Sequence, residues 1–362
     1  MVIVGMGTFT YLGTRQSRIA VAPHKPTQSS PSPQAFRLPG TLYLAQSGAI
    51  YSLSAGRFHQ LTPEQGWSQP SLYPDGQNML AIRRFSQYSN VFILSRFGQV
   101  KDQLTVNSAP AGVTDTRFFH WSFYPRMSLD EKTVFMSYDE PKFQYNVDLS
   151  IWSMSPYGTI HQGHLWTNSN GYTGGDIEPI PLKGGGIIYT KYGYSPEAKL
   201  VGQIWITNQA GSVGRALTTP EQDCYQPSIS PDRHYVAMIC SFEQQSADLM
   251  IAPFDGSHIG RLSEVNGNQL VAQPIWAPDG SGIAYLAPAL PDGPFQLWFL
   301  PRAAYSSPAP SPRPSARPTV SSPGSPAPVL TPSPLPTPTQ VGPIQITTDL
   351  GFDATSPMSW LS

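Results

Sequence analysis

The 362-residue chain carries 22 Lys and Arg against 23 Asp and Glu. This balance excludes the concentrated positive charge that nucleic acids and anionic membranes attract. Charged residues make up only 12% of the chain, which contains 39 Pro and 31 Gly. Few charges with many turn-forming residues favour an all-β protein over a helical one, and large all-β folds often reach this length as one domain.

The chain begins with an apolar stretch, residues 1–13, followed by Arg15 and Arg18. A membrane span needs roughly 20 residues, so we interpret residues 1–20 as a short or truncated membrane anchor. A signal-peptide core and an ordinary N-terminal extension are the alternatives. Residues 21–40 are rich in Pro and Ser and predict a linker. An apolar start followed by such a tether predicts that residues 41–362 form an extracytoplasmic domain.

One pattern recurs along this domain: Gln-Pro or a similar pair, a short apolar stretch, a Pro-Asp-Gly-like turn and an alternating apolar strand. The copies are QPSLYPDGQNMLAI, YPRMSLDEKTVFMS, EPIPLKGGGIIYT, QPSISPDRHYVAM, QPIWAPDGSGIAYLA and a shortened SPMSWLS. Their prolines lie 55, 54, 48, 47 and 83 residues apart, at Pro70, Pro125, Pro179, Pro227, Pro274 and Pro357. The first four spacings match a repeat of roughly 40–50 residues, the size of a four-stranded propeller blade.

The two ends of the domain complete the count of blades. Residues 42–62 look like the last three strands of a blade, and the C-terminal SPMSW looks like a first strand without its successors. Pairing Ser356–Trp360 beside Leu42–Leu44 closes the ring without open sheet edges. The sequence therefore predicts an all-β, six-bladed β-propeller of four-stranded antiparallel blades, closed by its N- and C-terminal strands.

These Pro-Asp-Gly units, followed by Ile-Tyr, a Gly turn and Leu-Thr, resemble the WD40-like repeats of the TolB-like six-bladed β-propeller family. The resemblance covers about Leu42–Ser362. It implies a protein-binding, sensor or accessory role at a bacterial envelope, although propellers of this pattern serve many tasks. The chain departs from the family in two respects: the α/β domain that precedes the TolB propeller has no counterpart, and Lys183–Gly186 replaces the third Pro-Asp-Gly.

Residues 306–340 account for the longest spacing and contain twelve prolines. Such a segment cannot bury enough apolar surface to order itself, so we expect a disordered, polyproline-like insertion. It separates FQLWFLP from IQITTD, which places it between the third and fourth strands of a blade, on the face opposite the aromatic loops. A tolerated spacer is one interpretation. The other is an arm that spans the cell wall, is glycosylated or is bound by a proline-recognising partner.

Several residues suggest chemistry without forming a catalytic pattern. Asp75, Asp130, Asp232 and Asp279 recur at one repeat position, where Asp stabilises a turn. His161 and His164 have no carboxylate or Cys beside them, so no metal ligand set is predicted. The sequence contains no nucleophile elbow, zinc-protease motif or phosphate-binding loop, and no cofactor is expected.

The two cysteines flank one repeat hairpin, with Asp232 midway between them. Cys224 and Cys240 can therefore lie opposite each other on adjacent strands. In an oxidising compartment they form a disulfide; otherwise they are two small buried apolar residues.

A binding surface is expected where the loops leading into each first strand meet those joining second and third strands. We call this side of the propeller the loop face. Aromatic and Arg side chains on loops over a rigid scaffold are typical of recognition surfaces. The candidates are Trp67, Arg84, Arg117, His120, Trp121, Tyr138, Asp176, Glu178, Tyr192, Tyr194, Tyr225 and Asp353. The alternative is that many of them pack between blades.

Three functions fit these features. The first is a non-catalytic, monomeric, envelope-associated propeller that binds a protein or peptide partner through the loop face, with no nucleic acid and with membrane contact only through the anchor. The second is a carbohydrate-active enzyme, a polysaccharide lyase or glycan hydrolase, with its site at the channel mouth. The third is a structural or sensor module. A tight cluster of His120, Asp176 and Glu178 would favour the enzyme.

Overall fold

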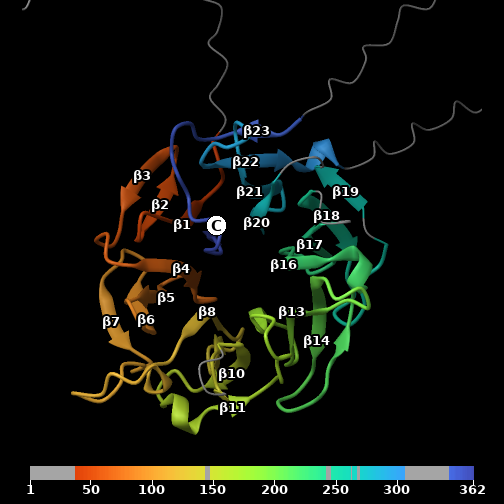
Figure 1. The fold of residues 1–362 in the computed structure, drawn as a ribbon. Coiled ribbons are helices and arrows are strands. Elements are labelled where there is room, and N and C mark those ends of the chain that lie inside the picture. Colours follow the sequence, from red (N-terminus) through yellow and green to blue (C-terminus); the bar gives the residue numbers. More distant parts are fainter. Residues whose placement is uncertain (1–36, 143–146, 242–245, 262, 267–269, 306–341) are drawn as a thin grey trace, which may run out of the picture. The chain divides into compact units, whose positions relative to one another are not determined.

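The computed structural model describes residues 37–142, 147–241, 246–261, 263–266, 270–305 and 342–362. Arg37–Ser362 form one compact unit. In this unit six four-stranded antiparallel sheets surround a central channel, which confirms the predicted β-propeller (Figure 1). The other unit, Met1–Phe36, lies outside the described residues, and so does the anchor expected at residues 1–20. No helix in the described ranges is long and apolar enough to cross a membrane.

Each blade contains four strands in chain order, except that blade 6 combines the last strand with the first three. Blade 1 consists of β4 (Trp67–Leu72), β5 (Asn78–Arg84), β6 (Ser89–Ser95) and β7 (Val100–Gln103), and blade 2 of β8 (Ser122–Met127), β9 (Val134–Tyr138), β10 (Ser150–Met154) and β11 (His164–Leu165). Blade 3 consists of β12 (Asp176–Pro181), β13 (Ile187–Tyr194), β14 (Leu200–Thr207) and β15 (Arg215–Ala216), and blade 4 of β16 (Cys224–Ile229), β17 (Tyr235–Cys240), β18 (Asp248–Pro253) and β19 (Ser263–Asn266). Blade 5 consists of β20 (Ala272–Trp276), β21 (Gly282–Pro288), β22 (Phe295–Pro301) and β23 (Ile344–Gln345), and blade 6 of β24 (Ser359–Leu361), β1 (Thr41–Gln46), β2 (Ala49–Ser54) and β3 (Arg57–Gln60).

The short 3-10 helices occur in connections between these strands. They are η1 (Thr116–Phe118), η2 (Ile160–Gln162), η3 (Pro220–Gln222) and η5 (Arg302–Ala304). The hydrophobic core lies between neighbouring blades, because the inner strands of each sheet are buried on both faces. One cluster joins Leu80 and Ile82 of blade 1 to Val134 and Met136 of blade 2.

The ring closes through blade 6, where β24 pairs antiparallel with β1. Thr41 lies opposite Leu361, and Tyr43 lies opposite Ser359. The Trp360 indole Nε1 donates a hydrogen bond of 2.7 Å to the Pro39 carbonyl. The terminal strand thus supplies the first strand of the blade whose other three strands come from the N-terminal part of the domain, as the sequence predicted.

The recurring aspartates stabilise hairpin turns, also as predicted. Each accepts a hydrogen bond from the backbone N–H two residues further on: Asp75 from Gln77, Asp130 from Lys132, Asp232 from His234 and Asp279 from Ser281. Blade 3 lacks this Asp but keeps its hairpin, because Gly184, Gly185 and Gly186 all adopt positive φ angles of 81–93°. These turns define the turn face of the propeller, opposite the loop face.

A β-bulge interrupts the first strand of blades 1 to 5, just before the repeat proline. The bulge residues all have φ of 52–57°: Gln69, Tyr124, Glu178, Gln226 and Gln273. A left-handed residue in a strand turns its own N–H out of the sheet ladder. The following Pro has no N–H to lose from the ladder.

The described chain stops at Tyr305 and resumes at Gly342, between β22 and β23 of blade 5. The Pro-rich insertion predicted at residues 306–340 therefore lies outside the described residues. The two strands that flank the undescribed residues, β22 and β23, are the third and fourth strands of blade 5.

Candidate functional site

The bulge residues surround the channel and are linked from blade to blade by hydrogen bonds. The Gln69 N–H donates to Ser356 Oγ at 2.7 Å, and the Tyr124 N–H donates to Gln69 Oε1 at 2.6 Å. The Gln273 N–H donates to Gln226 Oε1 at 2.8 Å. In blades 1, 2 and 5 the N–H of the bulge residue is thus satisfied by a side chain that precedes it around the ring, which helps to fix the side chains that face the channel.

A cavity of about 550 Å³ occupies the channel from this ring to the turn face. Its walls combine prolines and other apolar side chains with a few polar groups, as in ligand pockets of this size. The lining includes Ser71, Pro74, Arg126, Glu178, Ile180, Pro181, Pro227, Ser228, Pro231, Gln273, Ile275, Trp276, Pro278, Met358, Ser359 and Trp360.

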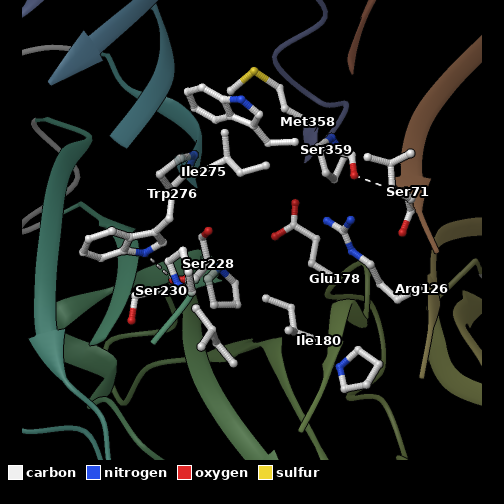
Figure 2. Close-up of a pocket in the computed structure, with 18 of the residues that line it drawn as sticks. Ser71, Arg126, Glu178, Ile180, Ser228, Ser230, Ile275, Trp276, Met358 and Ser359 are labelled. Carbon is white, nitrogen blue, oxygen red and sulfur yellow. Dashed lines mark hydrogen bonds between the residues drawn. The ribbon is translucent and has the colours of Figure 1, made fainter. Parts of the chain in front are cut away.

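Two charged side chains face each other in this cavity. Figure 2 shows the carboxylate of Glu178, from β12, and the guanidinium of Arg126, from β8, pointing toward one another. Glu178 is 5% exposed, and its Oε2 has no hydrogen-bond partner among the described residues. Its Oε1 accepts a hydrogen bond of 3.3 Å from Gln273 Nε2. In the described part of the chain, Arg126 forms no ion pair within 4.0 Å.

Burial perturbs both groups. Desolvation raises the pKa of Glu178 to about 7, partly offset by the Gln273 hydrogen bond, by the positive charge of Arg126 and by the Gln226 N–H. Burial lowers the pKa of Arg126, and the negative charge of Glu178 opposes that shift. Buried polar groups are usually hydrogen-bonded, so Glu178 Oε2, which has no partner among the described residues, can still accept a hydrogen bond.

Phenol groups lie near the same carboxylate. The negative charge of Glu178 contributes to the raised pKa values of Tyr124, Tyr192 and Tyr225, although desolvation is the largest cause for all three. The Tyr225 hydroxyl shares a hydrogen bond of 2.9 Å with Ser241 Oγ. The structure therefore brings three of the expected residues together, Glu178, Tyr192 and Tyr225. Of the twelve candidates, only Glu178 lines the cavity.

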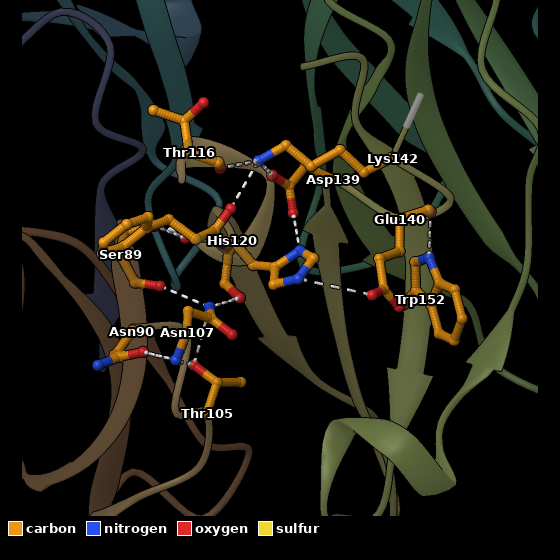
Figure 3. Close-up of polar contacts among 12 residues, drawn as sticks. Ser89, Asn90, Thr105, Asn107, Thr116, His120, Asp139, Glu140, Lys142 and Trp152 are labelled. Carbon is orange, nitrogen blue, oxygen red and sulfur yellow. Dashed lines mark hydrogen bonds and ion pairs between the residues drawn. The ribbon is translucent and has the colours of Figure 1, made fainter. Parts of the chain in front are cut away.

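A second group of candidates lies on the loop face of blades 1 and 2. The Arg84 guanidinium stacks over the Trp121 ring at 5.4 Å. His120 Nδ1 lies 2.9 Å from Asp139 Oδ1, and Lys142 Nζ lies 3.2 Å from Asp139 Oδ2 (Figure 3). This polar network ties the loop before β8 to the loop after β9.

The remaining candidates are engaged in structural contacts. Trp67 and Tyr138 were expected on loops, but both are buried in strands because their rings fill the space between sheets. Asp176 is also buried in a strand and pairs with Lys191 at 3.0 Å. The others bond locally: Arg117 to Asp115, the Tyr194 hydroxyl to the Tyr172 carbonyl, and Asp353 to the Thr355 N–H.

Sequence reasoning missed Arg126, Tyr124 and the channel glutamines. A signal was present, because every bulge residue directly precedes the repeat proline and Arg126 directly follows one. The repeat was interpreted as turn and strand chemistry, and the residues beside its proline were not assigned to the channel.

The cysteines lie directly opposite each other on β16 and β17, and a disulfide joins Cys224 to Cys240 with a Cα–Cα distance of 4.1 Å. Both residues are fully buried. The bond crosses the hairpin of blade 4 next to Tyr225, one of the residues near Glu178.

No group of three or more His, Cys, Asp and Glu is placed to hold a metal ion within the described ranges. His120, Asp176 and Glu178 are not clustered, because His120 pairs with Asp139, Asp176 pairs with Lys191 and Glu178 lies in the channel. The cluster that would favour a carbohydrate-active enzyme is therefore not formed.

Two TolB structures with TM-scores of 0.50 and 0.55 support the architecture. The chain is similar to TolB of Acinetobacter baumannii, with a TM-score of 0.55 and 13% identity over 74% of this chain and 62% of that one. It is also similar to a provisionally assigned TolB of Agrobacterium tumefaciens, with a TM-score of 0.50 and 15% identity over 73% of this chain and 85% of that one. A gluconolactonase of Xanthomonas campestris aligns with a TM-score of 0.47 and 11% identity, over 73% of this chain and 77% of that one.

At these identities the likeness shows the fold alone: a six-bladed propeller of the kind found in TolB proteins. The chain spans less than two thirds of the Acinetobacter baumannii protein. No protein-family model matches the sequence, and no curated protein matches it.

Proposed function

We propose that this protein is a non-catalytic, envelope-associated propeller that binds a peptide segment of a protein partner in its channel cavity. The observation that carries the proposal is the Glu178 carboxylate oxygen, which has no hydrogen-bond partner among the described residues and faces the Arg126 guanidinium in that cavity. The TolB-like architecture and the apolar walls of the cavity support it.

A peptide group fits the chemistry of the pair. Its N–H can donate to Glu178 Oε2 and its carbonyl can accept from Arg126, while prolines and apolar side chains along the channel take up neighbouring side chains. Hydrogen bonds to charged groups contribute about 1.5–3 kcal/mol each when water is excluded. An extended segment can therefore be held by few contacts at the centre of a rigid ring.

The location outside the cytoplasm is part of the proposal. The Cys224–Cys240 disulfide supports it, because such bonds persist in oxidising compartments and are rare in the cytosol. The expected N-terminal anchor would hold the propeller at the envelope.

The proposal is tested by selecting peptides from a displayed random library on the propeller, with counter-selection on the Arg126→Met variant. Methionine replaces the unbranched apolar stem of arginine and removes the guanidinium with its charge and its donors. We expect peptides that bind the wild-type protein and that the variant does not retain. Selection of the same peptides by both proteins, or of none by the wild type, would contradict the proposal.

A matched control is Lys101→Met, which removes one positive charge from an exposed strand on the outer edge of blade 1. This variant should retain the selected peptides, because Lys101 is on β7, the last strand of its blade, and does not line the channel cavity. Loss of binding in this variant would point to non-specific charge attraction instead.

A further inference from the structure

A second cavity, of about 610 Å³, lies on the turn face between blades 4 and 5. It adjoins the channel cavity but differs from it in carrying three aromatic rings, along with three prolines, among its fourteen lining residues. We call it the aromatic groove; it is lined by Ser230, Pro231, Asp232, Tyr235, Ile251, Pro253, Ser263, Val265, Trp276, Pro278, Asp279, Gly280, Arg302 and Tyr305.

Three rings form the floor and sides of the aromatic groove. Trp276 lies between Tyr235 and Tyr305, with ring centroids 6.4 Å and 6.3 Å away. Tyr235 is 37% exposed, so its ring is accessible, whereas Trp276 is nearly buried. Grooves lined by aromatic rings bind proline-rich segments, because the ridges of a polyproline II helix pack between the rings.

One polar group in the groove lacks a partner. The Tyr305 hydroxyl is buried and has no hydrogen-bond partner within the described ranges. Desolvation raises the pKa of Tyr305 to about 12, so the phenol stays protonated and can donate. A polyproline helix leaves all of its carbonyl oxygens free to accept such a bond.

The chain itself carries a segment of the matching composition. Residues 306–340 contain twelve prolines and begin directly after Tyr305, which lines the groove. Their only charged residues are Arg313 and Arg317. The groove presents the exposed carboxylates of Asp232 and Asp279, whose pKa values are lowered by hydrogen bonds from Ser230 and Ser281 respectively. Arg302 also lines the groove, so two carboxylates stand against one guanidinium and the excess negative charge is opposite to that of Arg313 and Arg317.

We propose that the aromatic groove is a polyproline-binding site and that its occupant is the first half of this chain's own Pro-rich segment, residues 306–320. The segment follows directly on Tyr305 of the groove, and this short tether favours it as the occupant, because a tethered segment has an effective concentration in the millimolar range. The groove adjoins the channel cavity and shares Pro231, Trp276 and Pro278 with it. The occupant proposed here does not use Glu178 or Arg126, which line the channel cavity and not the groove.

The first experiment measures elastase cleavage of the full-length protein in the segment, at Ala316–Arg317 and Val320–Ser321. Tyr235→Ala removes the accessible ring of the groove without disturbing a fully buried side chain. We expect cleavage about tenfold faster than in the wild type, as for loss of about 1.4 kcal/mol of docking free energy. Tyr157→Ala, which removes a 95% exposed tyrosine on blade 2, should leave the rate unchanged. Equal rates in all three proteins would overturn the proposal.

The second experiment identifies the occupant with a labelled peptide of residues 306–320. It is titrated onto the full-length protein and onto a variant in which a short Gly-Ser linker replaces residues 306–340. We expect the variant to bind at least about tenfold more tightly, because the tethered segment competes in the full chain. Equal binding to both would mean that the groove is open to a proline-rich partner and would refute occupation by the chain's own segment. Binding to neither would refute polyproline recognition.

Discussion

Glu178 and Arg126 stand on the first strands of neighbouring blades and point toward each other across the channel, yet no ion pair joins them in the described structure. Both are held in place by the bulge that precedes the repeat proline. Hydrogen bonds join the bulge residues of blades 1 and 2 and of blades 4 and 5, and Gln273 of blade 5 donates to Glu178. The testable consequences concern the charge of Glu178, the ring itself, its closure, the disulfide and the channel pair.

Replacing Glu178 by Gln should stabilise the protein at high pH and change little at low pH. The pKa of Glu178 is about 7 in the folded protein and about 4.5 when unperturbed, so the folded state binds the proton more tightly. The stability that the protonated Glu178 contributes is therefore fully present below pH 4.5 and is lost as pH rises from 4.5 to 7. The loss is on the order of 2–3 kcal/mol. Denaturant unfolding of both proteins at pH 5 and pH 8 measures it, and an equal difference at both pH values would contradict the account.

Gln69→Leu should destabilise the propeller by about 1–3 kcal/mol, because it leaves the Tyr124 N–H without its acceptor at the channel. Chemical denaturation gives the change in free energy of unfolding. Gln99→Ala, at an exposed turn of the same blade, is the matched control and should stay within about 0.5 kcal/mol of the wild type. Similar effects of the two substitutions would show that the ring of hydrogen bonds adds no stability.

Because β24 closes blade 6, a substitution in this terminal strand should lower the stability of the propeller. Trp360→Ala removes the indole bond to Pro39 and the edge contact with Phe299, whose ring centroid is 6.3 Å away. We expect a loss of about 2–3 kcal/mol, less than for a fully buried Trp. Removal of Ser362 alone, beyond β24, should have no measurable effect on thermal unfolding. A wild-type melting temperature for Trp360→Ala would refute a closing role for β24.

The disulfide of blade 4 should be detectable by mass. Reduction of Cys224–Cys240 adds about 2 Da under denaturing conditions, and an unchanged mass would exclude the bond. The bond closes a short loop, so its removal in the Cys224→Ala, Cys240→Ala double variant should cost about 3 kcal/mol. The single variants are unsuitable, since each leaves a free buried thiol.

The fold could be predicted because the same local sequence pattern recurs in every copy of the repeat. Asp75, Asp232 and Asp279 mark turns by their own side-chain bonding, and the complementary ends around Leu42 and Trp360 imply closure. Trp67 and Asp176 could not be placed in the same way. Whether an aromatic or acidic side chain near a strand end packs between sheets or faces solvent depends on the bulge and on the neighbouring blade, which the pattern of one strand does not contain. Arg126 was missed for the same reason.

The most direct test of the channel as the binding site is the affinity of one selected peptide for two matched arginine variants, measured by isothermal titration calorimetry. Arg126 lines the channel cavity, whereas Arg84 stacks on Trp121 at the loop face. We predict that Arg126→Met weakens binding about tenfold or more and that Arg84→Met changes it by less than about twofold. Weakened binding in Arg84→Met with unchanged binding in Arg126→Met would contradict the account and assign the partner to the loop face.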